Sequence, residues 1–237
     1  MSTLAPVQES WDPEALDPDT MILNMGPQHP STHGVLRLEL KTDGEIVRAV
    51  RPHIGYLHRC FEKHCEVVDY PGVLPYTDRL DYCAAMGNTL GFALAMEKMV
   101  GIECSPYVNA IRVLMAELQR IASHAVAVGT YGMDLGAFTP FLHLLRDREK
   151  ILDLFEWTCG ARLLYNYNWV GGVSHDLPEG FLKACRGMIR EYEAVTHPEL
   201  VELLIGNKIF IKRTAGVGIL SQELAISHDL TGPNLRG

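Results

Sequence analysis

The sequence predicts an α+β protein, in which a small antiparallel sheet near the N-terminus precedes a mostly α-helical bundle. Two observations favour this fold class. The segment VLRLEL (35–40) alternates apolar and polar residues, KTDGE supplies a turn, and IVRAV (46–50) alternates again, which is the pattern of a β-hairpin. Beyond Tyr56 the apolar period lengthens, and prolines, glycines and capping residues bracket a succession of helices.

The chain is expected to have three parts. Residues 1–20 carry acids and prolines but no base, which predicts an extended or disordered arm. Residues 21–56 form the β region, where MILNM is a further candidate strand. Residues 57–237 form the helical domain, and we expect it to be incomplete because the sequence stops at Gly237 on a loop that follows a turn signal.

Helix boundaries follow from caps and breakers. The first helix has small residues every fourth position (Cys83, Gly87, Gly91, Ala95), a spacing that lets another helix approach closely. The segment KIFIK (208–212) is expected to be extended. The expected helices are 78–100 after Thr77, 106–129 after Ser105, 140–167 after Thr139, one opened by Asp176 and Pro178 to about Val195, one from His197–Pro198 to Gly206, and a last one after Ser221.

Composition narrows the function. The net charge of -8 and the pI of about 5.7 argue against a nucleic-acid binder. No two of the six cysteines form C-x-x-C, and the N-terminus has no signal-peptide pattern, which indicates reduced thiols in a cytoplasmic protein. The longest uncharged run, from Tyr82 to Met96, is shorter than the roughly 20 residues that span a bilayer.

The stretch GPQHPSTHG (26–34) presents His29 and His33 on a stiff loop between two candidate strands. Such histidines are often solvent-exposed or bonded to backbone. Alternatively, the loop holds a hydrogen-bonding group rigidly against a ligand, as loops on a scaffold often do.

Two further residues have both a structural and a functional interpretation. Tyr82, in YTDRLDY, is either a core tyrosine with a satisfied hydroxyl or a proton donor in a shielded site. Asp134, in GMDLG, is expected on a turn after the second helix.

One face of the second predicted helix carries Glu117, Arg120 and His124. These residues are expected to form a buried polar stripe.

A metal site is disfavoured. Cys60 with His64, and His58 with Cys65, share faces if HRCFEKHCE is helical, but Cys60 and Cys65 point in different directions. No further Cys/His pair completes four ligands nearby.

Seven stretches, taken together, resemble a known family. LNMGPQHPSTHGVLRLEL, PHIGYLHRCFEK, LPYTDRLDY, ELQRIASH, GMDLGAFTPF, GGVSHDLP and TGPNLRG closely resemble, in the same order, the D subunit of proton-pumping NADH:quinone oxidoreductase, respiratory complex I. The resemblance implies the fold of the nickel–iron hydrogenase large subunit. Family members continue past the last motif with further helices.

The resemblance also implies roles for individual residues. His33 and Tyr82 hydrogen-bond the quinone headgroup, and Asp134 is the partner of that histidine. Arg59 lies towards the terminal [4Fe-4S] cluster, which the adjacent B subunit carries. The remaining residues of the quinone-cavity loop are His29, Pro30, Ser31, Thr32 and Gly34.

By the same resemblance this chain holds no cofactor or metal of its own, and quinone is its substrate. Its partners are the B and C subunits and the quinone-channel membrane subunit, and it sits peripherally on the cytoplasmic side of the bacterial inner membrane.

Two residues depart from the family pattern, Leu164 where many members have histidine and Trp169 where many have arginine. The alternatives are a truncated scaffold paralogue without quinone chemistry and a hydrogenase-like metalloenzyme, which RLDYCAAM, lacking a C-x-x-C pair, disfavours.

Overall fold

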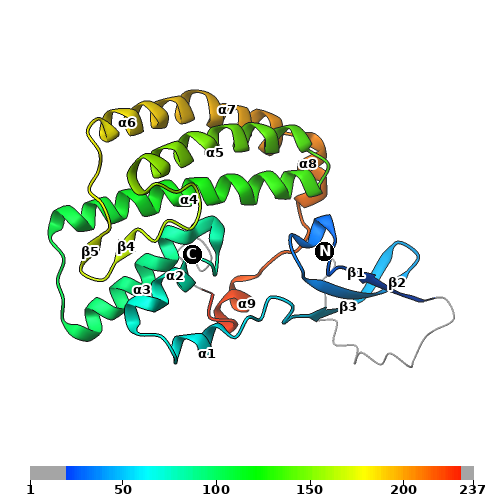
Figure 1. Cartoon of the computed structure of the whole chain (residues 1–237). Coiled ribbons are helices and arrows are strands. Elements are labelled where there is room, and N and C mark those ends of the chain that lie inside the picture. The colour runs from blue at the N-terminus through cyan, green and yellow to red at the C-terminus, as the bar shows by residue number, and fades with distance from the viewer. Residues whose placement is uncertain (1–19, 231–237) are drawn as a thin grey trace. The chain divides into compact units, whose positions relative to one another are not determined.

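The computed structural model describes residues 20–230 and confirms the α+β class, with a small antiparallel sheet followed by helices (Figure 1). The predicted arm at residues 1–20 lies outside the described residues except for Thr20. The chain divides into two compact units, Met1–Val67 and Val68–Gly237. We describe each unit by itself.

The first unit is built on a three-stranded antiparallel sheet in the order β1 (Met21–Met25), β2 (Arg37–Asp43), β3 (Ile46–His53). The register places Leu23 beside Leu40 and Leu40 beside Val50, so one face of the sheet is apolar. The predicted hairpin and the predicted MILNM strand are both present. A short helix, α1 (Phe61–Cys65), follows the sheet.

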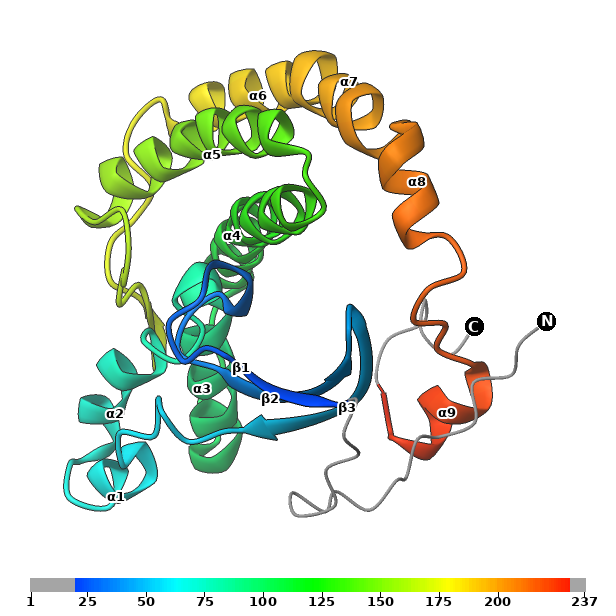
Figure 2. The ribbon, with the colours of Figure 1, turned by 90° about the vertical axis from the view of Figure 1, so that its right-hand side faces the viewer.

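The second unit is almost entirely helical. Its long central helix, α4, contacts α3 on one side and α5 on the other, and α6 and α7 lie along α5 (Figures 1 and 2). Its elements are α2 (Tyr70–Thr77), η2 (Tyr82–Ala84), α3 (Ala85–Val100), α4 (Pro106–Asp134), α5 (Phe138–Cys159), β4 (Asn168–Trp169), β5 (Gly172–Val173), α6 (Phe181–Glu191), η3 (Tyr192–Thr196), α7 (His197–Leu200), η4 (Val201–Ile205), α8 (Lys208–Thr214) and α9 (Gln222–Ser227).

The apolar core of this unit lies between α3, α4 and α5 and is closed by α6. Met115 from α4, Phe155 from α5 and Phe181 from α6 are all fully buried. Small residues allow close helix contacts, since a Cβ added to Gly129 would lie 3.1 Å from the Phe141 ring and one added to Gly132 would lie 3.0 Å from Leu204.

A buried ion pair joins α3 and α4 to the β4–β5 hairpin. The Arg112 guanidinium donates to both carboxylate oxygens of Glu97, at 3.0 and 2.6 Å, and to the carbonyl oxygens of Trp169 and Gly172. Glu97 also accepts a bond from the backbone N–H of Gly171. Hydrogen bonding to Arg112 lowers the pKa of Glu97 to about 2, against the opposing effect of burial.

The first predicted helix begins later than expected. Thr77 is the last residue of α2 and its hydroxyl donates to the Leu74 carbonyl, so it caps nothing. The chain then makes a 3₁₀ turn at Tyr82–Ala84 before α3 begins at Ala85. The reason is that Asp78 turns inward and accepts a 2.6 Å hydrogen bond from the backbone N–H of Asn166.

The second predicted helix begins as expected but ends later. Ser105 accepts a bond from Val108 N–H and caps α4. The helix continues through Gly129, because Gly129 and Gly132 are contact points for neighbouring elements, and ends at Asp134. Asp134 is therefore its last residue and does not lie on a turn beyond it.

Four later boundaries were also wrong. Helix α5 begins at Phe138, so Thr139 lies inside the helix and does not cap it. Helix α5 ends at Cys159, where Gly160 takes a left-handed conformation, and the expected helix to Tyr167 gives way to the β4–β5 hairpin. Gly180, and not Asp176, precedes the fourth helix. The π-helical turns η3 and η4 continue that helix without a break through His197–Pro198.

KIFIK is helical, because the Asn207 side chain accepts bonds from Ile209 N–H and Phe210 N–H and caps α8. Ser221 caps α9 as predicted.

The prediction of a buried polar stripe on the second helix is wrong, since the Glu117–Arg120 pair is more than half exposed and His124 is exposed as well.

Two properties hold for the described part of the chain. None of its helices combines the length and the apolar character needed to cross a membrane. All six cysteines lie within it and none is paired in a disulfide.

Candidate functional site

The GPQHPSTHG loop joins the edge strand β1 to the central strand β2 and is closed on itself. Its ends meet in a β-bridge between His29 and Gly34. Between them Pro30–Thr32 makes one 3₁₀ turn, in which Thr32 N–H and the Thr32 hydroxyl both bond the His29 carbonyl, at 3.1 and 2.8 Å. The His29 ring Nδ1 accepts from Ser31 N–H. His29 therefore caps the turn.

His33 is the residue at which this turn ends. It adopts a left-handed conformation (φ 47°, ψ 48°), which costs a non-glycine residue roughly 1–2 kcal/mol, and its N–H bonds the Pro30 carbonyl at 3.4 Å. The side chain is exposed. Gly26 is required at the start of the loop, because its φ is +89° and an added Cβ would lie 2.1 Å from the Leu36 carbonyl oxygen. The fold thus fixes the backbone of the loop and presents the His33 ring outward.

Tyr82 lies in the second unit, on the turn between α2 and α3. Residues on both sides of it are anchored, since the Asn88 side chain donates to the Asp81 carbonyl at 3.0 Å and the Gln119 side chain donates to the Cys83 carbonyl at 2.7 Å. The Tyr82 side chain is 55% exposed. Tyr82 is therefore not a core tyrosine whose hydroxyl is hydrogen-bonded inside the protein, which was the structural interpretation of its sequence context.

Asp134 lies at the C-terminal end of α4. The turn after it is held by backbone bonds, from Gly136 to Met133 and from Ala137 to Gly132, and Arg213 of α8 donates to the Leu135 carbonyl at 3.0 Å. The Asp134 side chain is exposed.

Arg59 lies on the exposed segment between β3 and α1. The two departures from the family pattern lie in the second unit, where Leu164 has a left-handed backbone (φ 57°) and the Trp169 indole N–H donates to the Asn166 carbonyl at 2.7 Å. Trp169 also supplies a carbonyl to the buried Arg112, so its backbone is part of the ion-pair structure.

The predicted site residues are divided between the two units. The whole loop and Arg59 belong to the first, whereas Tyr82 and Asp134 belong to the second. The pairing of His33 with Asp134, and its convergence with Tyr82 on one ligand, therefore stay predictions.

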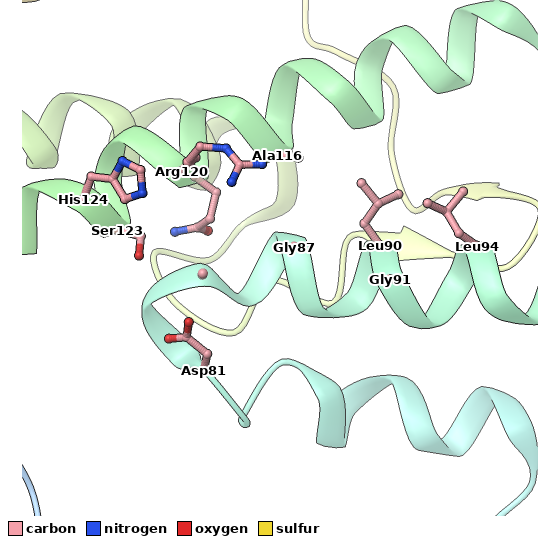
Figure 3. A pocket seen from close by; sticks show the side chains of 11 residues that line it. Asp81, Gly87, Leu90, Gly91, Leu94, Ala116, Arg120, Ser123 and His124 are labelled. Carbon is pink, nitrogen blue, oxygen red and sulfur yellow. The ribbon is translucent and has the colours of Figure 1, made fainter. Parts of the chain in front are cut away.

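Within the second unit Tyr82 follows Asp81 beside the middle of α4, whereas Asp134 is the last residue of that helix. Asp81, next to Tyr82, lines the same groove as His124 (Figure 3). Asp134 follows His124 by ten residues along α4 (124 to 134), which at 1.5 Å per residue is about 15 Å.

Sequence reasoning missed a groove of about 450 Å³ between α3 and α4. Figure 3 shows Asp81, Ser123 and His124 at one end and Leu90 and Leu94 at the other. The remaining lining residues are Ala84, Gly87, Gly91, Ala116, Gln119 and Arg120. The small-residue spacing on α3 is the signal that could have found it, but by itself that spacing predicts only a helix contact.

A second missed feature is a buried carboxyl. Asp78 is 1% exposed, and while one oxygen accepts the Asn166 N–H, the other has no hydrogen-bond partner among the described residues. Burial raises the pKa of Asp78, opposed by the Asn166 hydrogen bond and by Arg79. Its neighbour Tyr165 is also buried, and burial raises its pKa to about 12.

Comparison with known proteins identifies the family. Residues 134–237 match the model of the respiratory-chain NADH dehydrogenase 49 Kd subunit. The chain is 56% identical over 219 residues to the NADH-quinone oxidoreductase D subunit of Chlorobium phaeobacteroides, and 59% identical over 222 residues to that of Chlorobium chlorochromatii. Each match covers 92% of this chain. The chain belongs to the family of these D subunits.

The relatives are much longer than the chain. It spans 54% of the two Chlorobium proteins, and 55% of the corresponding D subunit of Chlorobaculum parvum, to which it is 56% identical over 225 residues. It therefore spans about half the length of the relatives that it matches.

Proposed function

We propose that this chain contributes the quinone-reduction site of a proton-translocating NADH:quinone oxidoreductase and acts only within that complex. The observation that carries the proposal is the closed loop of the first unit. A strained backbone at His33, fixed by the His29–Gly34 bridge and the Thr32 hydroxyl, holds an imidazole outward at a defined place. A segment that only connects two strands has no need of this arrangement.

In the proposed reaction a quinone accepts two electrons and two protons and becomes a quinol. His33 and Tyr82 each donate a hydrogen bond to one carbonyl oxygen of the headgroup, where negative charge develops during reduction. Each donor then passes one proton to that oxygen, so both protons of the quinol come from side chains of this chain. The electrons arrive through the [4Fe-4S] cluster of the adjacent B subunit, towards which Arg59 lies.

Asp134 has a supporting role in this proposal. As the partner of His33 it orients the ring and stabilises the protonated imidazole before the proton is passed on. After both protons have left, the His33–Asp134 pair is more negative by the lost imidazolium charge. We infer that this change shifts the loop and is transmitted to the quinone-channel membrane subunit, which couples reduction to proton translocation. The remaining loop residues line the quinone cavity, namely His29, Pro30, Ser31, Thr32 and Gly34.

The test is Tyr82→Phe in the complex, purified with the membrane from its own cells. We expect quinone reduction to fall at least tenfold, because general acids contribute about 10²–10⁴-fold, while NADH oxidation by ferricyanide and the protein composition of the complex stay at the wild-type level. Tyr70→Phe is the matched control, since Tyr70 is 60% exposed and lies outside the proposed site. Wild-type quinone turnover in the Tyr82 variant would contradict the proposal.

The second candidate is a scaffold paralogue that binds neighbouring subunits without quinone chemistry. One observation favours it, namely that the side chains of His33, Tyr82 and Asp134 are all exposed. A scaffold predicts that Tyr82→Phe, His33→Ala and Asp134→Asn all leave quinone turnover unchanged. The same assay therefore separates the two functions.

A further inference from the structure

Tyr82 is placed by its backbone more than by the packing of its ring. Its side chain is 55% exposed, so contacts with the protein constrain the ring only weakly. The backbone here is a single 3₁₀ turn, Tyr82–Ala84, closed by a 3.0 Å bond from Ala84 N–H to the Asp81 carbonyl. Hydrogen-bond geometry is poorer in a 3₁₀ turn than in an α-helix. The turn therefore needs outside support if the Tyr82 hydroxyl is to keep one place.

Two side chains from different helices supply that support. The Asn88 amide of α3 donates to the Asp81 carbonyl at 3.0 Å, and the Gln119 amide of α4 donates to the Cys83 carbonyl at 2.7 Å. The Asp81 carbonyl belongs to the peptide group that leads into Tyr82, and the Cys83 carbonyl belongs to the peptide group one residue beyond it. The two bonds therefore hold the backbone on both sides of Tyr82.

Gln119 is an unfavourable residue for its position unless its amide has a task. Its side chain is 1% exposed, and its carbonyl oxygen has no hydrogen-bond partner among the described residues. Burying half of an amide unpaired costs free energy, which an apolar side chain of similar size would avoid. The same helix buries Met115 and Leu118 nearby. The bond to the Cys83 carbonyl is what the amide provides and methionine or leucine cannot.

We propose that Asn88 and Gln119 are positioning residues of the quinone reaction, which hold the Tyr82 hydroxyl where it passes its proton and do not touch the quinone themselves. The proposal rests on the proposed role of Tyr82 as a proton donor. A displacement of about 1 Å in a reacting group can slow a reaction about 10²-fold. Loosening this turn should therefore slow the chemical step while quinone still binds.

The test measures quinone turnover by the purified complex with Asn88→Ala or Gln119→Met, each alone and combined with Tyr82→Phe. Asn109→Ala is the matched control, because Asn109 is another helical asparagine whose side chain donates to a backbone carbonyl, at 3.4 Å, and it precedes Gln119 by ten residues (109 to 119) on α4. We expect Asn88→Ala and Gln119→Met to lower kcat roughly tenfold with KM changed less than about twofold, and Asn109→Ala to keep the wild-type kcat.

The double variants separate positioning from general damage. If the amides act only through the Tyr82 hydroxyl, adding either substitution to Tyr82→Phe should lower kcat by less than about a further twofold, whereas structural damage would multiply the two losses. A multiplied loss, a wild-type kcat in either single variant, or an equal loss in Asn109→Ala would overturn the positioning role.

Two further outcomes are also decisive. If Gln119→Met prevents assembly, Asn88→Ala decides by the same criteria, since Asn88 is only partly buried. A wild-type kcat in Tyr82→Phe alone would refute the proposed function itself. A loss in Tyr82→Phe that is multiplied by Asn88→Ala would refute only the positioning role.

Discussion

The Glu97–Arg112 pair offers a stability prediction that the structure allows to be worked through. Its side chains are 7% and 2% exposed, and it joins α3, α4 and the β4–β5 hairpin. Replacing Glu97 by Gln keeps the size and one acceptor oxygen, but it leaves the Arg112 charge buried without a counter-charge. The perturbation therefore removes one charge and replaces one acceptor oxygen by a donor that faces the Arg112 N–H groups.

The expected magnitude follows from the pKa. Hydrogen bonding to Arg112 lowers the pKa of Glu97 from 4.5 to about 2. The difference between these values corresponds to roughly 3 kcal/mol of folding free energy at neutral pH. Breaking one side of a buried pair costs about 3–5 kcal/mol, which agrees in size. We expect Glu97→Gln to lower the free energy of unfolding by about this amount.

The pH dependence gives a second, independent test. Because the pKa is lower in the folded state than in the unfolded state, the stabilisation is fully present above pH 4.5 and is lost as the pH falls towards 2. The wild-type chain should therefore lose stability across this window, and Glu97→Gln should lose less. Urea titrations followed by circular dichroism at several pH values between 3 and 7, chosen from these values, measure both effects.

Glu117→Gln is the control for this prediction. Glu117 pairs with Arg120 on the same helix, but both side chains are more than half exposed, so solvent screens the pair. Its urea midpoint should match the wild type at every pH. If Glu97→Gln has the same midpoint as Glu117→Gln, or keeps the wild-type pH dependence, the buried pair does not stabilise the fold in the way argued.

Three further predictions concern other parts of the chain. Burial raises the pKa of Asp78 in the folded state, so the ionised carboxyl destabilises the fold when the pH rises above the pKa that Asp78 has in the unfolded chain. Asp78→Asn should therefore raise the urea midpoint at pH 7 more than at pH 4. Asn207→Ala removes the N-cap of α8 and should cost about 1 kcal/mol, seen as faster amide hydrogen exchange confined to Lys208–Thr214. In a double-mutant cycle of quinone turnover, Tyr82→Phe and Asp134→Asn should be less than additive, because the proposal makes both residues act on the same reduction step. Full additivity would mean that they act independently.

Local signals in the sequence predicted the elements that local chemistry decides. The strands around Asp43–Gly44 and the caps at Ser105 and Ser221 are set by neighbouring residues, and each is present. The prediction for KIFIK was wrong because its alternation of apolar residues resembles a strand, while one upstream side chain, that of Asn207, caps a helix there. Cap chemistry outweighed periodicity in so short a segment.

Long-range contacts decided what the sequence could not show. The first helix begins at Ala85 because Asp78 binds the backbone of Asn166, a residue far along the chain. The buried charges are Glu97 and Arg112, whereas the apparent stripe of Glu117 and Arg120 faces solvent. Helical periodicity places residues on a common face, but which face is buried depends on the neighbouring helices.

The separation of Tyr82 from Asp134 also limits how the proposed site can work. Tyr82 lies between residues that are anchored to α3 and to the middle of α4, whereas Asp134 lies at the C-terminal end of α4. In the proposal, the group that links Asp134 to the quinone is His33 on its strained loop. A change in charge at Asp134 can then reach the headgroup only by moving or recharging the imidazole. Proton transfer and loop movement are therefore the same event in this mechanism, and a variant that stiffens the loop without touching Tyr82 should slow both together.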